Sequence, residues 1–155
     1  MCLLLAQATW RLTPLALEPI AEGMSPWEWS LYVGWIGLNG YLEGYRGFQT
    51  RFSPRVVQRA YWLADDPRPL WVLFAPVFCM SYFHATRRGK VVAWTLLIFI
   101  VCAVIAVRAL PQPWRGIVDA GVVVGIAWGL LAILVFWVRA LSHGAARPND
   151  LPEDA

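Results

Sequence analysis

Three long stretches of this chain contain no Asp, Glu, Lys or Arg. They cover residues 69–86, 91–107 and 120–138. A helix needs about 20 mostly apolar residues, and about 17 at the least, to cross the hydrocarbon layer of a bilayer. All three stretches reach this length with their flanks, and open strands are excluded because their backbone groups would stay unpaired in lipid. The sequence therefore predicts spanning helices over about 69–86, 91–109 and 117–139.

The composition supports a membrane protein. Of the 155 residues, 59% are hydrophobic and only 15% are charged, whereas a soluble domain carries about 25% charged residues. A soluble enzyme, a disordered chain and a nucleic-acid-binding protein are therefore poor fits, and three cysteines are too few for a disulfide-rich secreted scaffold. We expect an all-α, polytopic membrane protein with a single transmembrane domain over residues 26–141.

A fourth, more polar span is expected over residues 27–46, which makes a small bundle of about four transmembrane helices. Ser25 is suited to cap this helix and Pro26 to occupy its first turn. Trp27 and Tyr45 lie near its two ends, where aromatic side chains favour the headgroup region of a bilayer.

Glycine recurs along the first and last predicted spans. The first contains Gly34, Gly37, Gly40 and Gly44, and the last contains Gly121, Gly125 and Gly129. Small residues let membrane helices approach each other closely, so both glycine faces predict helix packing. The pattern fits packing within one chain and packing between chains equally. Besides the lipid bilayer, we therefore expect a homo-oligomer or a larger membrane complex.

A short amphipathic helix is predicted over residues 54–64, after the first span. Its apolar side chains share one face, while Arg55 and Arg59 fall on the other, a pattern typical of a helix that lies in the membrane interface. Arg55, Arg59 and Trp62 are candidates for docking a partner or anionic lipid. The alternative is a connector that only rests on the surface.

The two ends of the chain are expected to lie outside the bundle. Pro14 and Pro19 interrupt residues 1–25, which predicts an interfacial or disordered arm. A start at Met24 would on this reading leave the bundle complete. Residues 142–155 are polar and contain proline, which predicts a disordered tail.

The orientation in the membrane stays open at this stage. Four crossings with the amino terminus outside place seven Lys or Arg residues inside and six outside, so the positive-inside rule does not decide. If residues 69–86 turned back at Pro76 as a re-entrant hairpin, ten Lys or Arg residues would lie inside and three outside. Their 18 uncharged residues favour a crossing.

Glu43 and Arg46 are the strongest candidates for a functional site. Ionisable side chains within a membrane segment are costly and are by default functional candidates. Three residues apart on a helix, the two can pair, and Asn39 and Tyr45 are close in sequence. The four residues could bind a small polar ligand or an ion. The alternative is an ion pair that ends the first helix at the interface.

No residue pattern in the sequence indicates catalysis, and no cofactor is expected. His84 and His143 lack a third ligand at metal spacing, so no metal site is expected either. We therefore expect a non-catalytic accessory or scaffold subunit that packs through its glycine-lined helix faces, in the cytoplasmic (inner) membrane of a bacterium. The alternative is a small oligomeric transporter or ligand-binding protein that uses Glu43 and Arg46. A membrane enzyme of lipid or quinone chemistry is the third possibility.

Overall fold

The fold is helical throughout the part of the chain that the structure describes. This structure, a computed structural model, describes residues 2–65, 72–83 and 85–144, and no strand occurs among them. The all-helical fold class is thereby confirmed. His84 and most of the predicted disordered tail, residues 145–155, lie outside the described residues, as does the beginning of the predicted span 69–86.

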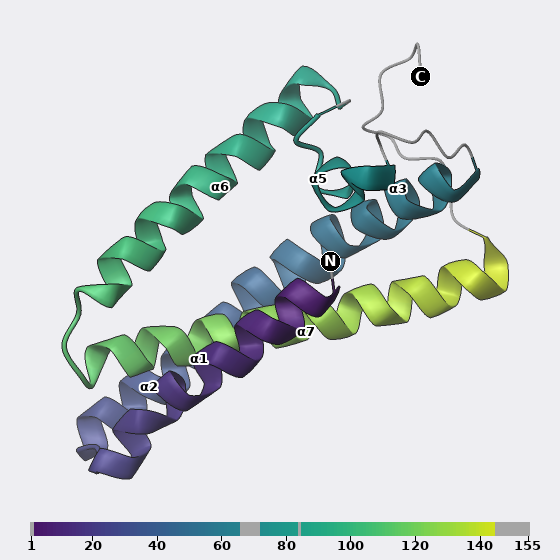
Figure 1. Cartoon of the computed structure of the whole chain (residues 1–155). Coiled ribbons are helices and arrows are strands. Elements are labelled where there is room, and N and C mark those ends of the chain that lie inside the picture. The colour runs from purple at the N-terminus through teal and green to yellow at the C-terminus, as the bar shows by residue number, and fades with distance from the viewer. Residues whose placement is uncertain (1, 66–71, 84, 145–155) are drawn as a thin grey trace.

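The helices follow one another with short connections (Figure 1). In chain order they are α1 (Cys2–Glu22), α2 (Pro26–Asn39), η1 (Gly40–Phe52), α3 (Ser53–Asp65), α5 (Ala75–Cys79), α6 (Arg87–Arg108) and α7 (Trp114–His143). The helix η1 is a π-helix, with backbone hydrogen bonds from i to i+5 in place of i to i+4. No break separates α2, η1 and α3, so they form one long continuous helix.

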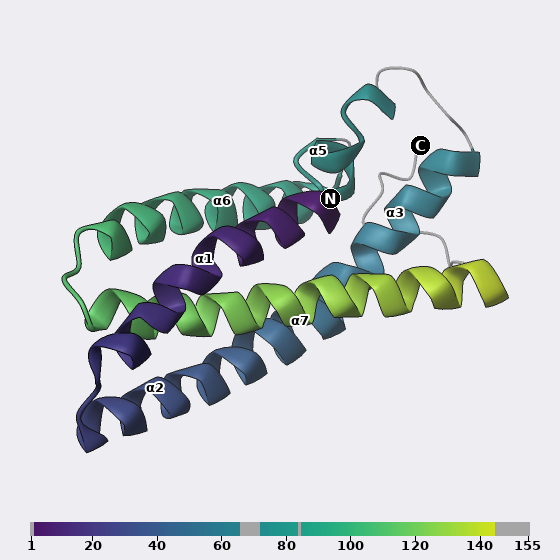
Figure 2. The ribbon, with the colours of Figure 1, turned by 60° about the horizontal axis from the view of Figure 1, so that its bottom comes forward.

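The helix α7 is the central helix of the molecule. The long helix α2–η1–α3 runs parallel to it, because Asn39 contacts Gly121 and Phe48 contacts Gly129. The helix α1 runs antiparallel, with Pro19 against Gly116 at one end and Cys2 packed near the Ile133 cluster at the other. Figure 2 shows α1 and α2 on either side of α7.

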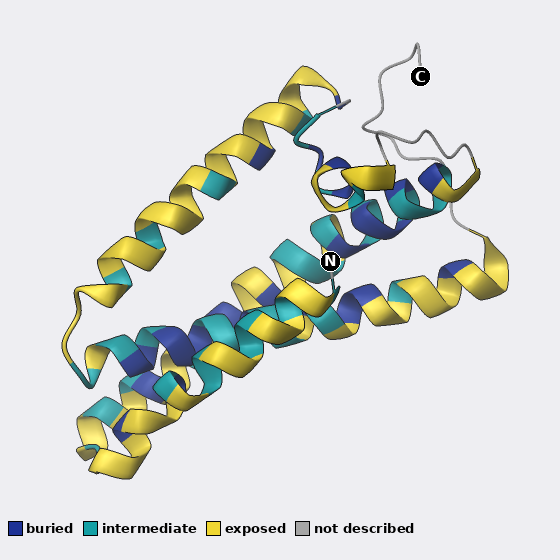
Figure 3. Cartoon of the chain, in the orientation of Figure 1, coloured by how far each residue is buried: buried dark blue, intermediate teal, exposed yellow. Residues whose placement is uncertain are grey.

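The helix α6 stands apart from this three-helix unit in Figure 1. Its only buried residue is Ala93, and Figure 3 shows it exposed along most of its length. Phe99 is 67% exposed and Ile105 65%. By length and composition, α6 and α7 are the two described helices that could cross a membrane. They correspond to the spans predicted over 91–109 and 117–139.

The predicted spanning helix over residues 69–86 is wrong for the described part of that stretch. Residues 75–79 form the five-residue helix α5, and turns follow it, with Ser81 at a φ of +65°. Phe78 and Cys79 are buried against Val56 and Leu63 of α3. The short helix α5 is stable here because α3 provides a surface that covers it.

The amino-terminal residues also differ from the expectation of a loose arm. Residues 2–22 form the continuous helix α1, despite Pro14 and Pro19. Its Ala16 is buried with Tyr32, Ile117 and Ala120, and the Tyr32 hydroxyl donates a hydrogen bond to the Ala16 carbonyl at 3.0 Å. A chain beginning at Met24 would therefore lack a helix that covers α7, contrary to our expectation.

The first predicted span, 27–46, begins where expected but does not end there. The helix continues through η1 into α3, which contains the predicted amphipathic helix 54–64. Glycine makes a poor helix former, yet Gly44 and Gly47 lie inside η1 because Gly44 packs closely on α7. Close packing therefore outweighs intrinsic propensity at this point.

Ser25 caps α2 in the way the sequence predicts. Its hydroxyl accepts a hydrogen bond from the Glu28 backbone N–H, while the Glu28 carboxylate accepts one from the Ser25 N–H at 2.7 Å. We expect Ser25→Ala to lower the free energy of unfolding by about 1 kcal/mol, because helix ends lose this much with their cap. Thermal unfolding followed by circular dichroism checks it. Ser30→Ala, which removes only an exposed bond within the helix, is the control, and equal shifts for both variants would contradict the prediction.

Candidate functional site

The glycine face of α7 receives side chains of the long helix. A Cβ on Gly121 would lie 2.6 Å from the Trp35 ring and 2.7 Å from Nδ2 of Asn39. A Cβ on Gly125 would likewise meet the Glu43 side chain, and a Cβ on Gly129 would meet the Phe48 ring. The three glycines thus accommodate large side chains of α2 and η1, within one chain.

The glycines of the first predicted span divide into two groups. Gly40 and Gly44 face α7, where a Cβ on Gly44 would lie 2.9 Å from the Trp128 ring. A Cβ on Gly34 or Gly37 would meet nothing within 4 Å. Gly40 and Gly44 therefore pack against α7, whereas Gly34 and Gly37 do not.

Two of the four candidate site residues face α7. Asn39 is buried, and its Nδ2 donates a hydrogen bond to the Trp35 carbonyl at 3.0 Å. Glu43 remains exposed on one side, but its carboxylate lies against Gly125, where a Cβ would be 2.8 Å from Oε2. Gly125 therefore leaves the room that the Glu43 carboxylate occupies.

The other two candidates point away from this contact. Arg46 is exposed, and no ion pair links it to Glu43 in the described structure. Tyr45 stacks on Tyr41, with the ring centroids 6.0 Å apart. The π-helix explains the separation: residues on one face of such a helix are about four to five positions apart, so residues three apart diverge. The structure thus does not assemble the four residues into one site.

The predicted docking role of Arg59 is contradicted. Arg59 is fully buried, where its Nε donates a hydrogen bond to the Phe78 carbonyl at 2.9 Å. Its Nη2 donates to the Phe83 carbonyl at 3.3 Å, and its guanidinium lies 4.3 Å from the centre of the Phe78 ring. Phe78 and Phe83 lie against this arginine, so it holds α5 in place instead of facing a membrane or partner.

The other two docking candidates lie near the same contact. Trp62 is partly buried and stacks on Phe78, with the ring centroids 5.9 Å apart. Arg55 is partly buried in the same helix. Arg59 and Trp62 are therefore both covered by Phe78 of α5.

Arg11 is a further candidate that we did not single out from the sequence. It is exposed on α1, between the contact of Ala16 with Ile117 and the contact of Leu5 with the Ile133 cluster. Arg11 is therefore close to the middle of α7. An arginine between two apolar stretches of one helix was the signal that could have identified it.

Comparison of the chain with protein-family models, curated proteins and solved structures finds no match. The described residues contain no group of three His, Cys, Asp or Glu side chains that could hold a metal ion. A functional assignment therefore depends on the geometry of the chain itself.

Proposed function

We propose that this chain is a non-catalytic accessory subunit of a membrane complex, in which α6 and α7 cross the bilayer. At about 1.5 Å per residue, the 22 residues of α6 rise about 33 Å, enough to cross the hydrocarbon layer. In this proposal, α1 and α2–η1 lie beside α7 at the same depth. The α3–α5 unit lies toward the end of the molecule where α6 begins, which we call the basic end.

The main support for the proposal is a group of exposed charged side chains that lie beside the middle of α7. Glu43 lies at the level of Gly125, and Arg46 lies about one turn further along, near the centre of the uncharged run 120–138. Arg11 is at a similar level on α1. Charged side chains at this depth are costly in contact with lipid. A partner that covers and pairs with them removes that cost, which favours a subunit over an isolated monomer.

The distribution of cations supports one orientation. The described cations at the basic end are Arg51, Arg55, Arg59, Arg87, Arg88, Lys90 and Arg139. The opposite end has Arg108 and Arg115 together with the acidic residues Glu18, Glu22, Glu28 and Asp119. By the positive-inside rule the basic end faces the cytoplasm. We propose the cytoplasmic membrane of a bacterium as its location.

Labelling of single cysteines tests this topology. With the native Cys2, Cys79 and Cys102 replaced by alanine, we expect Arg88→Cys and Ser142→Cys to react with an impermeant maleimide only from the cytoplasmic side. Pro111→Cys is expected to react only from the other side, because it lies in the connection between α6 and α7. Labelling of positions 88 and 111 from the same side would mean that α6 does not cross.

The subunit proposal is tested by removing one mid-depth charge. We expect Arg46→Leu to reduce the complex that co-purifies in mild detergent about tenfold, because the partner's charge would lose its counterpart. Native electrophoresis measures the assembled fraction. Arg88→Leu removes the same charge at the basic end and is expected to leave the assembly unchanged. A complex of unchanged abundance in Arg46→Leu would contradict the proposal.

A charge exchange identifies the kind of partner. Glu43 and Arg46 lie at similar depths, so two copies of the chain with parallel helices can pair Glu43 of one with Arg46 of the other. In that case the double variant Glu43→Arg, Arg46→Glu restores the assembly that each single variant loses. If the partner is a different protein, the double variant remains as defective as the single ones.

Transport or ligand binding is a second candidate, favoured by the position of the Glu43 carboxylate. It lies in a contact between two helices near the middle of α7, where an acidic side chain can bind a cation or proton. Glu43→Gln keeps the shape of the side chain and removes its charge. Loss of function in this variant with full assembly would favour transport, whereas loss of assembly would favour the subunit role.

A further inference from the structure

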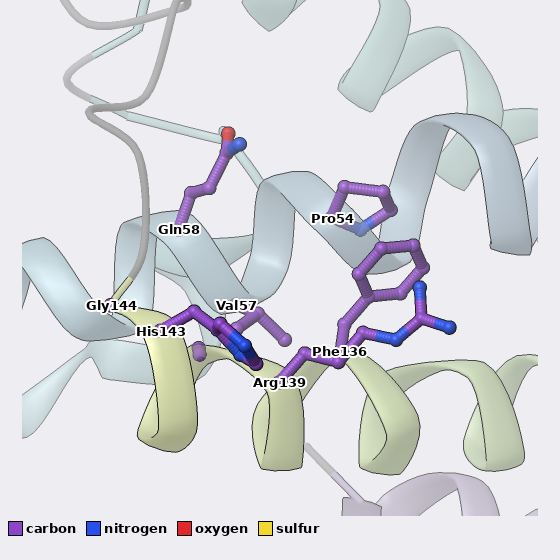
Figure 4. Close-up of a pocket in the computed structure, with 8 residues that line it drawn as sticks. Pro54, Val57, Gln58, Phe136, Arg139, His143 and Gly144 are labelled. Atoms are coloured by element: carbon purple, nitrogen blue, oxygen red, sulfur yellow. The ribbon is translucent and has the colours of Figure 1, made fainter.

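A cavity of about 370 Å³ lies between α3 and the end of α7, at the basic end (Figure 4). Its apolar lining is formed by Pro54 and Val57 of α3 and by Phe136 and Ala140 of α7. Arg139 and His143 of α7 complete it. In Figure 4 the His143 ring lies next to Val57, and the Arg139 side chain extends toward Phe136. The site is thus apolar with two basic groups on one wall.

Arg139 and His143 are four residues apart on α7 and share one face. The Arg139 guanidinium is 5.9 Å from the centre of the Phe136 ring. No ion pair engages Arg139 within the described ranges of the chain. A planar guanidinium in this position is suited to bind two oxygen atoms of a phosphate group.

The depth of the site indicates which phosphate it receives. Arg139 directly follows the uncharged run 120–138, so in the proposed membrane arrangement it lies at the level of the lipid headgroups. Phe136 lies one turn deeper, toward the lipid chains. The basic groups are therefore placed for a headgroup, and the apolar lining for the first part of an acyl chain. Basic pockets between membrane helices on the cytoplasmic side bind anionic lipid headgroups.

We propose that this pocket binds one anionic phospholipid, with its phosphate at Arg139 and an acyl chain along Pro54 and Phe136. The proposal rests on the membrane placement of α7 in the proposed function. It differs from the sequence-based expectation of a docking surface on Arg55, Arg59 and Trp62, because the lipid contact lies on the opposite side of α3, where α7 contributes Arg139.

Native mass spectrometry of the full chain in detergent micelles tests the site. We expect phosphatidylglycerol to be retained about fivefold better than phosphatidylcholine with the same acyl chains, because its headgroup carries a net negative charge. In Arg139→Gln, retention of phosphatidylglycerol is expected to fall to the level of phosphatidylcholine. Arg88→Gln loses the same charge on exposed α6 and is the matched control, with unchanged retention. Circular dichroism verifies that the variants stay folded.

Several outcomes would overturn the proposal. Equal retention of the two lipids by the native chain excludes an anionic lipid site, and an equal loss in Arg88→Gln shows attraction by overall charge only. If millimolar inorganic phosphate displaces phosphatidylglycerol, the cavity is a site for free phosphate. A chain that remains monodisperse without detergent would refute the membrane arrangement itself. A chain that needs detergent but does not discriminate between the lipids refutes the lipid site alone.

Discussion

Replacing Arg59 by alanine is expected to detach α5 from α3. The arginine is 0% exposed, and its guanidinium group donates hydrogen bonds to the carbonyls of Phe78 and Phe83. A hydrogen bond from a charged group contributes about 1.5–3 kcal/mol, and a buried cation–π contact about 2 kcal/mol. Because the contributions are not additive, we expect a total loss of about 3–5 kcal/mol for the docking of residues 75–83.

The expected change is local. The helix α3 also packs on α7 through Val57, which is buried with Ile133 and Ala140, so α3 is expected to remain helical. Hydrogen exchange followed by mass spectrometry separates the two regions. The amides of residues 75–83 are expected to exchange faster in Arg59→Ala, while those of α7 keep the native rate.

Two further variants show what the arginine contributes. Arg59→Lys keeps the charge but lacks the planar group that reaches both carbonyls. Its amide exchange rates in residues 75–83 are therefore expected to lie between those of the native chain and those of Arg59→Ala. Arg51→Ala removes an exposed arginine from the same long helix and is expected to change stability by less than about 0.5 kcal/mol. Native exchange rates in residues 75–83 of Arg59→Ala would refute the role of Arg59.

Charge-free length was enough to predict α6 and α7, but it failed for residues 69–86. The two former runs form single long helices in which no charged residue interrupts the apolar stretch. The latter stretch has a partner in α3. Arg59 donates hydrogen bonds to the carbonyls of Phe78 and Phe83, and the contact with Phe78 depends on a residue 19 positions away in the chain. A pattern of local hydropathy does not contain such a long-range contact.

The candidate site was predicted from α-helical spacing, which η1 does not have. Glu43 and Arg46 would be neighbours on an α-helix. In the π-helix only Glu43 stays with Asn39 on the α7 side. π-helices are rare, and a sequence gives little indication of where one forms. The residue types therefore indicated where charged side chains occur, whereas their mutual geometry was not predictable.

The role of α1 was missed for a related reason. Proline interrupts helices in water because it lacks a backbone N–H and leaves the carbonyl four residues before it unpaired. Pro19 leaves the Leu15 carbonyl in this state, and that carbonyl oxygen lies against Gly116 of α7. Proline is tolerated in helices that neighbouring helices support. The sequence showed the two prolines but not the helix that packs against them.

Gly116→Ala is expected to separate α1 from α7. A Cβ at this position would lie 2.9 Å from the Leu15 carbonyl oxygen and would overlap the Pro19 ring. These atoms belong to the backbone and to a rigid ring, so α1 as a whole must shift. Overpacking of this kind costs about 1–3 kcal/mol, and occasionally more. Thermal unfolding in detergent measures the loss. Faster maleimide labelling of Cys2, which packs near the Ile133 cluster, reports the release of α1.

Gly34→Ala is the matched control because it makes the same substitution on a helix where nothing lies within 4 Å. Here the better helix propensity of alanine is expected to stabilise the chain by up to about 1 kcal/mol. The two variants are therefore expected to change the stability in opposite directions, although both replace glycine by alanine within a helix. If Gly116→Ala were as stable as Gly34→Ala, with native labelling of Cys2, then α1 would not be held against α7 by this contact. The close packing of Pro19 on Gly116 would then have no energetic role.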